Sequence, residues 1–281
     1  MAMVATMLMI VKYAGEAGIS LPEIVFWRLA IPTVLMFLWF AASRNFDVIR
    51  THRVRSHLAR ALIGMAGLVC MFLSVTLLHL AESTTLSFTA PLYAVVLTAL
   101  VLREHVGLWR WIAVGLGFTG VLIIAQPSIA QVSMTGTAAG LVSGLFVAIV
   151  TFQIRDLART ENTMCIVFYF SLFGALIAGV AVPFFMTTHN LFEWSLLFAV
   201  GAIGTLSQWL IATSLRYGSV MGVIVIDYTT LIWSTLFGWL IWNSLPAWTT
   251  WLGAPAIIAA GLLIAWREHL LVRPAPSIAT N

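Results

Sequence analysis

Long apolar runs separated by short polar gaps occupy nearly the whole chain. On a window of about 19 residues, this pattern predicts an all-α polytopic membrane protein with ten transmembrane helices. The first run is short, since about 14 residues at 1.5 Å each reach only about 20 Å across a hydrocarbon core of about 30 Å. We interpret it as a shortened first span. The predicted spans are residues 2–14, 23–42, 58–78, 83–102, 109–126, 137–154, 164–186, 194–214, 219–242 and 248–266.

All but two of the fourteen lysines and arginines fall in alternate gaps between these spans. The intervening gaps carry Glu16, Glu82 and Glu193 but no basic residue. Because cytoplasmic loops collect Lys and Arg, the pattern predicts that both termini are cytoplasmic. The basic residues of the cytoplasmic gaps are Arg44, Arg50, Arg53, Arg55, Arg60, Arg103, Arg110, Arg155, Arg159, Arg216, Arg267 and Arg273.

Composition supports a membrane protein, with 61% hydrophobic residues, 9% charged residues and a mean hydropathy of +1.02. The basic balance therefore reflects the loops, and we expect no nucleic acid partner. Cys70 and Cys165 both lie inside predicted spans, so neither a disulfide framework nor a Cys-rich metal site is expected. No nucleotide-binding loop, HExxH motif or GxSxG motif occurs, which argues against an enzyme.

Two segments half a chain apart share one plan. Residues 83–126 and 219–266 each contain an apolar span that starts with small or hydroxyl residues, then a short turn, a Trp and a Gly-bearing span. With five spans per copy, the second copy enters the membrane from the opposite side, so we expect inverted repeats around a central cavity. This architecture is typical of secondary carriers. The predicted division is 1–126 for the first repeat, 127–136 for a linker, 137–267 for the second repeat and 268–281 for a cytoplasmic tail.

The stretch HLAESTTLSFTAPLYAVVLTALVLREHVGLWRWIAVGLGFTGVLII (79–124) resembles the EamA repeat of the drug/metabolite transporter (DMT) superfamily. The stretch SLRYGSVMGVIVIDYTTLIWSTLFGWLIWNSLPAWTTWLGAPAIIAAGLLI (214–264) resembles the same repeat, and Lys12, Pro22 and Arg28 match its first-to-second-span pattern. The resemblance covers nearly the whole chain. It implies a ten-helix carrier of the bacterial inner membrane, most similar to the YddG-type amino acid exporters.

The chain departs from that family pattern in two places. The first span lacks the usual tryptophan-glycine pair, and Asn243-Ser244 stands where the repeat usually has Gly-Glu. Any role that the family assigns to the glutamate of this Gly-Glu pair therefore does not carry over to this chain.

Asp227 is the ionisable residue that the pattern places nearest the midplane, about ten residues into the ninth span. Ionisable groups at that depth are costly and are functional candidates by default. Asp227 either attracts the ammonium group of a zwitterionic substrate, or takes up a proton in its place. The structural alternative is a hydrogen bond between helices that fixes the ninth span.

Two basic residues, Lys12 and Arg28, fall in the outer halves of spans one and two. Either one would make a dipolar amino acid site by meeting a substrate carboxylate opposite Asp227. The alternative is that they extend to the outer surface or pair with Glu16 and Glu23. His79 and Glu82, at the outer junction of spans three and four, form either a pH-sensing gate or an exposed loop pair.

Polar amides and aromatic residues complete the candidate site. Amides inside a membrane need a partner, which is a substrate or another helix. The large aromatic residues either wall an apolar cavity or pack in the core and against lipid. Pro91 removes a backbone donor within the fourth span and is the candidate hinge. The candidate substrate-binding residues are Asp227, Tyr228, Gln208, Trp209, Gln153, Tyr93, Phe88, His79, Lys12 and Trp233.

Together these features predict a secondary transporter that exports small metabolites by alternating access, with neutral and aromatic amino acids favoured as substrates. Its expected partners are the substrate, the lipid bilayer and, if transport is coupled, protons; no cofactor or metal is expected. A carrier for another metabolite or a lipophilic cation is the alternative. A membrane scaffold or intramembrane enzyme is the alternative from a different class.

Overall fold

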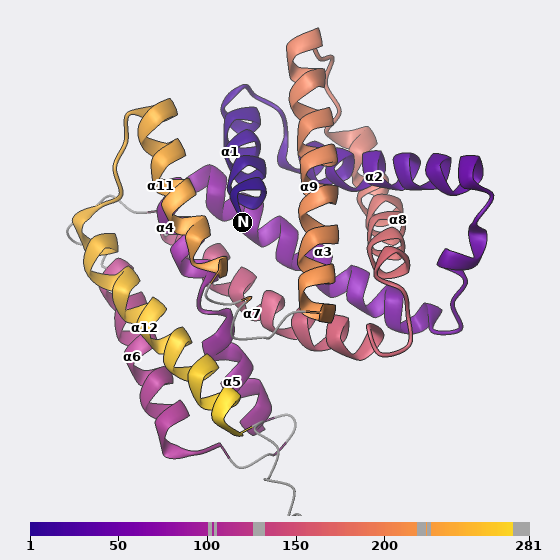
Figure 1. The fold of residues 1–281 in the computed structure, drawn as a ribbon. Helices are drawn as coiled ribbons and strands as arrows, with labels where there is room; N and C mark the ends of the chain where they lie inside the picture. Colours follow the sequence, from indigo (N-terminus) through magenta and orange to yellow (C-terminus); the bar gives the residue numbers. More distant parts are fainter. Residues whose placement is uncertain (101–102, 104–105, 126–132, 218–222, 224–225, 272–281) are drawn as a thin grey trace, which may run out of the picture.

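The computed structural model describes residues 1–100, 103, 106–125, 133–217, 223 and 226–271 (Figure 1), and within them the fold is all-helical. Most of the predicted linker 127–136 and tail 268–281 lies outside these residues, as does Glu104. The elements are α1 (Ala2–Glu16), α2 (Leu21–Ser43), η1 (Phe46–Ile49), α3 (Val54–Leu77), α4 (Leu80–Ser87), α5 (Ala90–Leu100), α6 (Leu108–Ile124), α7 (Met134–Leu157), α8 (Thr163–Ala181), η2 (Val182–Phe184), α9 (Leu191–Tyr217), α11 (Thr229–Trp242) and α12 (Trp248–Leu271).

Several of these helices are long enough to cross a bilayer. In the described part, seven stretches of at least 18 residues have the required apolar composition. The apolar helices α6 and α11 are shorter, and α1 has 15 residues. The chain is thus a multi-pass membrane protein. The seven stretches are Leu21–Ser43, Val54–Leu77, Leu80–Leu100, Met134–Leu157, Thr163–Phe184, Leu191–Ser214 and Trp248–Arg267.

Many large apolar side chains face outward, and several polar side chains are buried within a mainly apolar interior. Leu122 is 69% exposed and Val180 is 74% exposed, whereas Thr85 and Ser234 are completely buried. The first seven residues of α4 are all buried, and four of these, from Glu82 to Thr85, are polar. This short helix therefore lies at the centre of the fold.

The fourth predicted span is broken into α4 and α5 at Phe88 and Thr89. Pro91 is the second residue of α5, a position where the missing backbone N–H costs little. The break lies in the turn before Pro91, where a proline disrupts a helix, so the expected interruption of this span is observed and the hinge role of Pro91 stays a prediction. In the ninth span, α11 begins only at Thr229, immediately after Asp227 and Tyr228.

Glycine pairs bring several helices into close contact. A Cβ on Gly120 of α6 would lie 2.6 Å from the carbonyl oxygen of Gly253 of α12, and a Cβ on Gly253 would lie 2.5 Å from that of Gly120. These two helices run side by side in Figure 1. Gly144 of α7 similarly approaches Thr89. Gly115, in contrast, has open space around it.

Polar contacts between distant connecting segments follow the predicted sidedness. On the side with the Glu-bearing gaps, Trp242 Nε1 donates to Glu16 (2.5 Å) and the Ala247 backbone N–H donates to Glu82 (3.3 Å). On the arginine-rich side, Arg53 pairs with Asp156.

Candidate functional site

The breaks in the fourth and ninth spans meet at one place. The rings of Phe88 and Tyr228 contact each other edge to face, with centroids 4.9 Å apart. Tyr228 is 9% exposed, and its hydroxyl fits against Gly261 of α12, where a Cβ would lie only 1.7 Å from the oxygen. Two interrupted helices in corresponding positions are typical of transporter binding sites. The sequence predictions for Phe88 and Tyr228 thus fall on one aromatic contact.

A hydroxyl pair links α4 to α11 next to this contact. Thr84 Oγ1 donates to the Leu80 carbonyl (2.7 Å) and lies 2.9 Å from Ser234 Oγ. Since a hydroxyl has one proton, Ser234 donates to Thr84. The sequence analysis did not single out either residue, because Ser and Thr are common in packed membrane helices.

Buried hydroxyls without partners lie on the same elements. Ser83, Thr230 and Tyr228 each have a buried oxygen with no hydrogen-bond partner in the described part of the chain. Leaving such a group unpaired costs about 1–3 kcal/mol. All three lie on or beside α4 and α11, near the helix breaks.

Asp227 is half-buried, and no described residue donates a hydrogen bond to its carboxylate. The structural alternative, in which Asp227 fixes the ninth span by a hydrogen bond, therefore has no support here. Gln208 and Trp209 of α9 are also half-buried, and the Oε1 atom of Gln153 of α7 is buried without a hydrogen-bond partner among the residues that the structure describes. Tyr93 contacts Phe118 edge to face at 5.8 Å.

Arg28 lies deep between helices and is 1% exposed. Its Nη2 donates to the carbonyl of Gly204 (2.8 Å) and its Nε lies 3.3 Å from Met7 Sδ. A Cβ on Gly204 would lie 2.0 Å from Nε, so only glycine fits there. The expectation that Arg28 extends outward or pairs with Glu16 or Glu23 is wrong, because the guanidinium crosses to α9 instead.

Four further candidates have different surroundings from those expected. Lys12 Nζ donates to the carbonyl of Leu78 (2.6 Å) at the end of α3 and lies 5.6 Å from the Trp242 ring centroid. His79 is exposed, but Glu82 is 2% exposed, so the two form neither an exposed pair nor a contact. Trp233 is 39% exposed, and its ring is tilted against that of Phe237 with centroids 6.1 Å apart.

Two pockets lie along α11. An apolar groove of about 390 Å³ runs between α11 and α12, lined by residues such as Trp239, Leu245 and Trp251. A void of about 10 Å³, lined by His79, Ser234 and Gly238 among others, lies at the start of α4. Asp227, Gln208 and Gln153 line neither pocket. The central cavity expected from the sequence stays a prediction.

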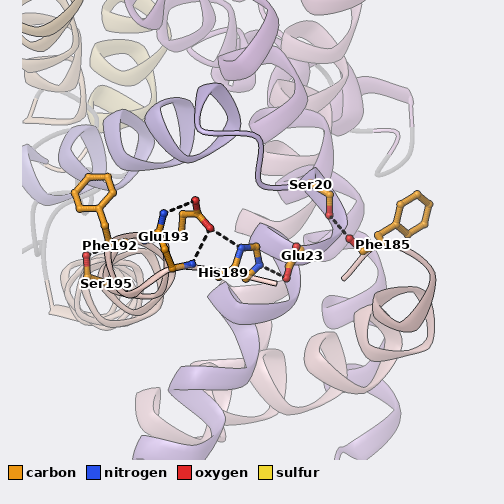
Figure 2. A network of polar contacts seen from close by, with 8 residues as sticks. Ser20, Glu23, Phe185, His189, Phe192, Glu193 and Ser195 are labelled. Carbon is orange, nitrogen blue, oxygen red and sulfur yellow. Dashed lines mark hydrogen bonds and ion pairs between the residues drawn. The ribbon is translucent and has the colours of Figure 1, made fainter. Parts of the chain in front are cut away.

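A buried polar network missed by the sequence analysis joins the start of α2 to the start of α9 (Figure 2). His189 Nε2 lies 2.5 Å from Glu23 Oε1, and its Nδ1 lies 3.0 Å from Glu193 Oε2. The side chains of His189 and Glu23 are 2% and 0% exposed. Two carboxylates facing both ring nitrogens require both to be protonated, as in an imidazolium.

The charge of His189 follows from competing effects. Burial disfavours the charged ring, but the hydrogen bonds to Glu23 and Glu193 outweigh burial and raise the pKa of His189 above its ordinary value. The network links the loop before α9 to α2, which are far apart in sequence. No local motif announces such a contact, since Glu23 and His189 are 166 residues apart.

Comparison with known proteins shows to which family this chain belongs. The model of the EamA-like transporter family matches residues 1–126 and 134–266. The chain belongs to the EamA-like transporter family. The resemblance of its two repeat stretches to EamA is thereby confirmed, and this EamA protein is a transporter, not an enzyme.

Relatives of this EamA protein differ in what they carry. The pseudopaline exporter CntI of Pseudomonas aeruginosa is 32% identical over 235 residues, which cover 80% of each chain. The S-adenosylmethionine uptake transporter of Rickettsia bellii is 24% identical and covers 92% of this chain and 87% of its own. The riboflavin transporter of Vibrio cholerae is 27% identical, and the alignment covers 82% of this chain and 78% of that transporter. These relatives support a small-metabolite transporter without specifying amino acids.

A solved crystal structure resembles the fold of this EamA protein. It aligns over 96% of this chain and 98% of its own, with a TM-score of 0.60 and 18% identity. At that identity, the likeness concerns the fold alone.

Proposed function

We propose that this protein exports small metabolites, above all neutral and aromatic amino acids, across the bacterial inner membrane by alternating access. The observation that carries the proposal is the meeting of two broken helices at Phe88 and Tyr228, next to Asp227, whose carboxylate has no hydrogen-bond partner among the described residues. Discontinuous helices at the centre of a carrier commonly form the substrate site.

Two inverted five-helix repeats would explain how the helices pair. In this relation α1 corresponds to α7, α2 to α8, α3 to α9, α4 to α11 and α6 to α12. Exchanging the two halves then converts a contact between two helices into a contact that the structure also contains. The α3·α7 contact becomes α9·α1, α3·α8 becomes α9·α2, and α4·α7 becomes α11·α1; all of these pairs pack together. The pairs α2·α8, α4·α11 and α6·α12 map onto themselves. This internal two-fold relation supports ten crossings with both termini on the arginine-rich, cytoplasmic side.

Charge placement favours a zwitterionic substrate. Asp227 offers an anionic group at the break in the ninth span. Arg28 offers a buried cation whose only described partners are a carbonyl and a sulfur atom, so a substrate carboxylate would compensate its charge. The apolar lining around Phe88 and Tyr228 favours neutral and aromatic side chains. Lys12 is already bound by the end of α3 and fits a structural role.

The test is transport by the purified protein in proteoliposomes, with radiolabelled amino acids, nucleobases, sugars and organic cations. We expect amino acids to be carried. For Asp227→Asn we expect loss of a charge-assisted hydrogen bond worth about 1.5–3 kcal/mol, which raises KM about 10- to 160-fold. If protons are coupled through Asp227, the variant also loses pH-driven flux while keeping downhill exchange.

Asp47→Asn is the matched control, because Asp47 is exposed in η1 and its change should leave KM unaltered. Transport of another substrate class without amino acids would contradict the substrate proposal. Equal kinetics of Asp227→Asn and Asp47→Asn would contradict the role of Asp227.

A further inference from the structure

Three potential metal ligands meet at the arginine-rich ends of α3 and α8. His57 Nε2 lies 3.9 Å from Cys165 Sγ, and Cys165 Sγ lies 3.5 Å from Glu161 Oε2. All three donor atoms lie within 4.8 Å of one another. His57 and Cys165 are completely buried, and Glu161 is partly buried. The residues come from both halves of the chain.

The ligand spacing suits a tetrahedral ion. With bonds of about 2.3 Å to sulfur and about 2.0 Å to nitrogen or oxygen, neighbouring ligand atoms lie about 3.3–3.6 Å apart. The sulfur–oxygen distance already matches this value, and the sulfur–nitrogen distance exceeds it by a few tenths of an ångström. The nitrogen and oxygen atoms lie within 4.8 Å of each other, so binding also requires the His57 ring and the Glu161 side chain to rotate toward each other by up to about 1.5 Å.

His57 itself points to a missing ligand. Its Nδ1 has no hydrogen-bond partner in the described part, and its Nε2 has only the long contact with the thiol. A buried imidazole with both nitrogens so poorly satisfied is costly, and a bound ion at Nε2 would relieve that cost. The ring is held by Tyr169, whose ring centroid lies 4.8 Å away and whose hydroxyl donates to the Ile49 carbonyl.

We propose that His57, Glu161 and Cys165 form a site for a divalent transition metal of the zinc class, which joins α3 of the first half to α8 of the second. Nitrogen, thiolate and carboxylate ligands favour Zn²⁺ or Co²⁺ over Mg²⁺ and Ca²⁺, which require oxygen ligands. Three protein ligands leave one position for water. By tying the two halves together, the ion would hold the cytoplasmic end of the transporter closed.

Binding exchanges a proton for the ion. The Cys165 thiol donates to Glu161 in the metal-free protein, and Thr51 Oγ1 donates to the other oxygen of Glu161 at 2.7 Å. When a metal–sulfur bond forms, the S–H bond breaks and the proton passes to solvent. The ion, one thiolate and one carboxylate then sum to zero charge. Arg60, buried one helical turn from His57, repels the cation, which limits the affinity.

The test is a Co²⁺ titration of the full-length, chelator-treated protein in detergent, followed by absorbance. We expect a saturable thiolate-to-cobalt charge-transfer band with tetrahedral visible bands, removed by competing Zn²⁺. Cys165→Ser should abolish the charge-transfer band, and His57→Gln should weaken binding by more than about 100-fold, since outer-shell partners alone contribute about 10- to 100-fold.

Cys70→Ser is the matched control, because Cys70 is the other cysteine and takes no part in the site. It should keep the band unchanged. Absence of the band from the wild-type protein would overturn the proposal, even if the variants fail to fold, and so would a band that persists in Cys165→Ser. Because this readout is metal binding and not flux, its outcome is separate from that of the transport proposal.

Discussion

The hydroxyl of Tyr228 offers a direct test of whether the contact between the broken helices binds substrate. It is buried, fits against Gly261 and has no hydrogen-bond partner in the described part of the chain. Replacing Tyr228 by Phe removes an unpaired group that costs about 1–3 kcal/mol in the closed protein. We therefore expect Tyr228→Phe to be more stable than the wild type, with a melting temperature at least about 2 °C higher.

The same substitution should impair transport. If the hydroxyl binds substrate when the site opens, its loss removes a hydrogen bond worth about 0.5–1.5 kcal/mol and raises KM about 2- to 12-fold. Tryptophan fluorescence on heating in detergent measures stability, and proteoliposome uptake measures KM. A gain in stability together with a loss in affinity distinguishes a functional group from a structural one.

Tyr169→Phe is the control, and its effect on stability should have the opposite sign. The hydroxyl of Tyr169 has a partner, because it donates to the Ile49 carbonyl at 3.1 Å. Its loss should destabilise the protein by about 1 kcal/mol. A Tyr228→Phe variant that is less stable than the wild type, or that transports with unchanged KM, would refute the reasoning.

Two further predictions concern stability. The folded pKa of His189 is raised because hydrogen bonds to Glu23 and Glu193 outweigh burial, so its stabilising contribution is complete below the unfolded value of about 6.5 and is lost as pH rises through the folded pKa. The melting temperature of the wild type should fall across that window, and His189→Gln should flatten the profile, whereas exposed His52→Gln should not. Gly120→Ala should destabilise the protein by about 1–3 kcal/mol, since its Cβ would meet the Gly253 carbonyl. Gly115→Ala in the same helix should be neutral or stabilising in the same melt, and equal effects of the two would contradict the packing argument.

Local patterns along the chain account for the helices. Each of the ten predicted apolar runs contains helix, and α2, predicted at 23–42, is observed at Leu21–Ser43. The largest departure is the fourth span, where buried polar residues of α4 replace a continuous membrane helix. Hydropathy could not reveal that break, because both pieces are helical and together long enough to cross.

Partners of the polar candidates were harder to predict. Arg28 was expected near Glu16 or Glu23, yet it contacts Gly204, 176 residues away. Glu23 instead faces His189. The spacing of residues in one helix restricts which face each occupies but not which helix covers that face.

The sequence by itself determined that this protein is a helical membrane transporter with two related halves, since transfer of apolar segments from water to lipid depends on local composition. Only the tertiary structure decided which side chains meet, such as Phe88 with Tyr228, His189 with its two glutamates, and His57 with Cys165. Those contacts join helices far apart in the chain, and their energies depend on burial and geometry that arise only when the helices pack.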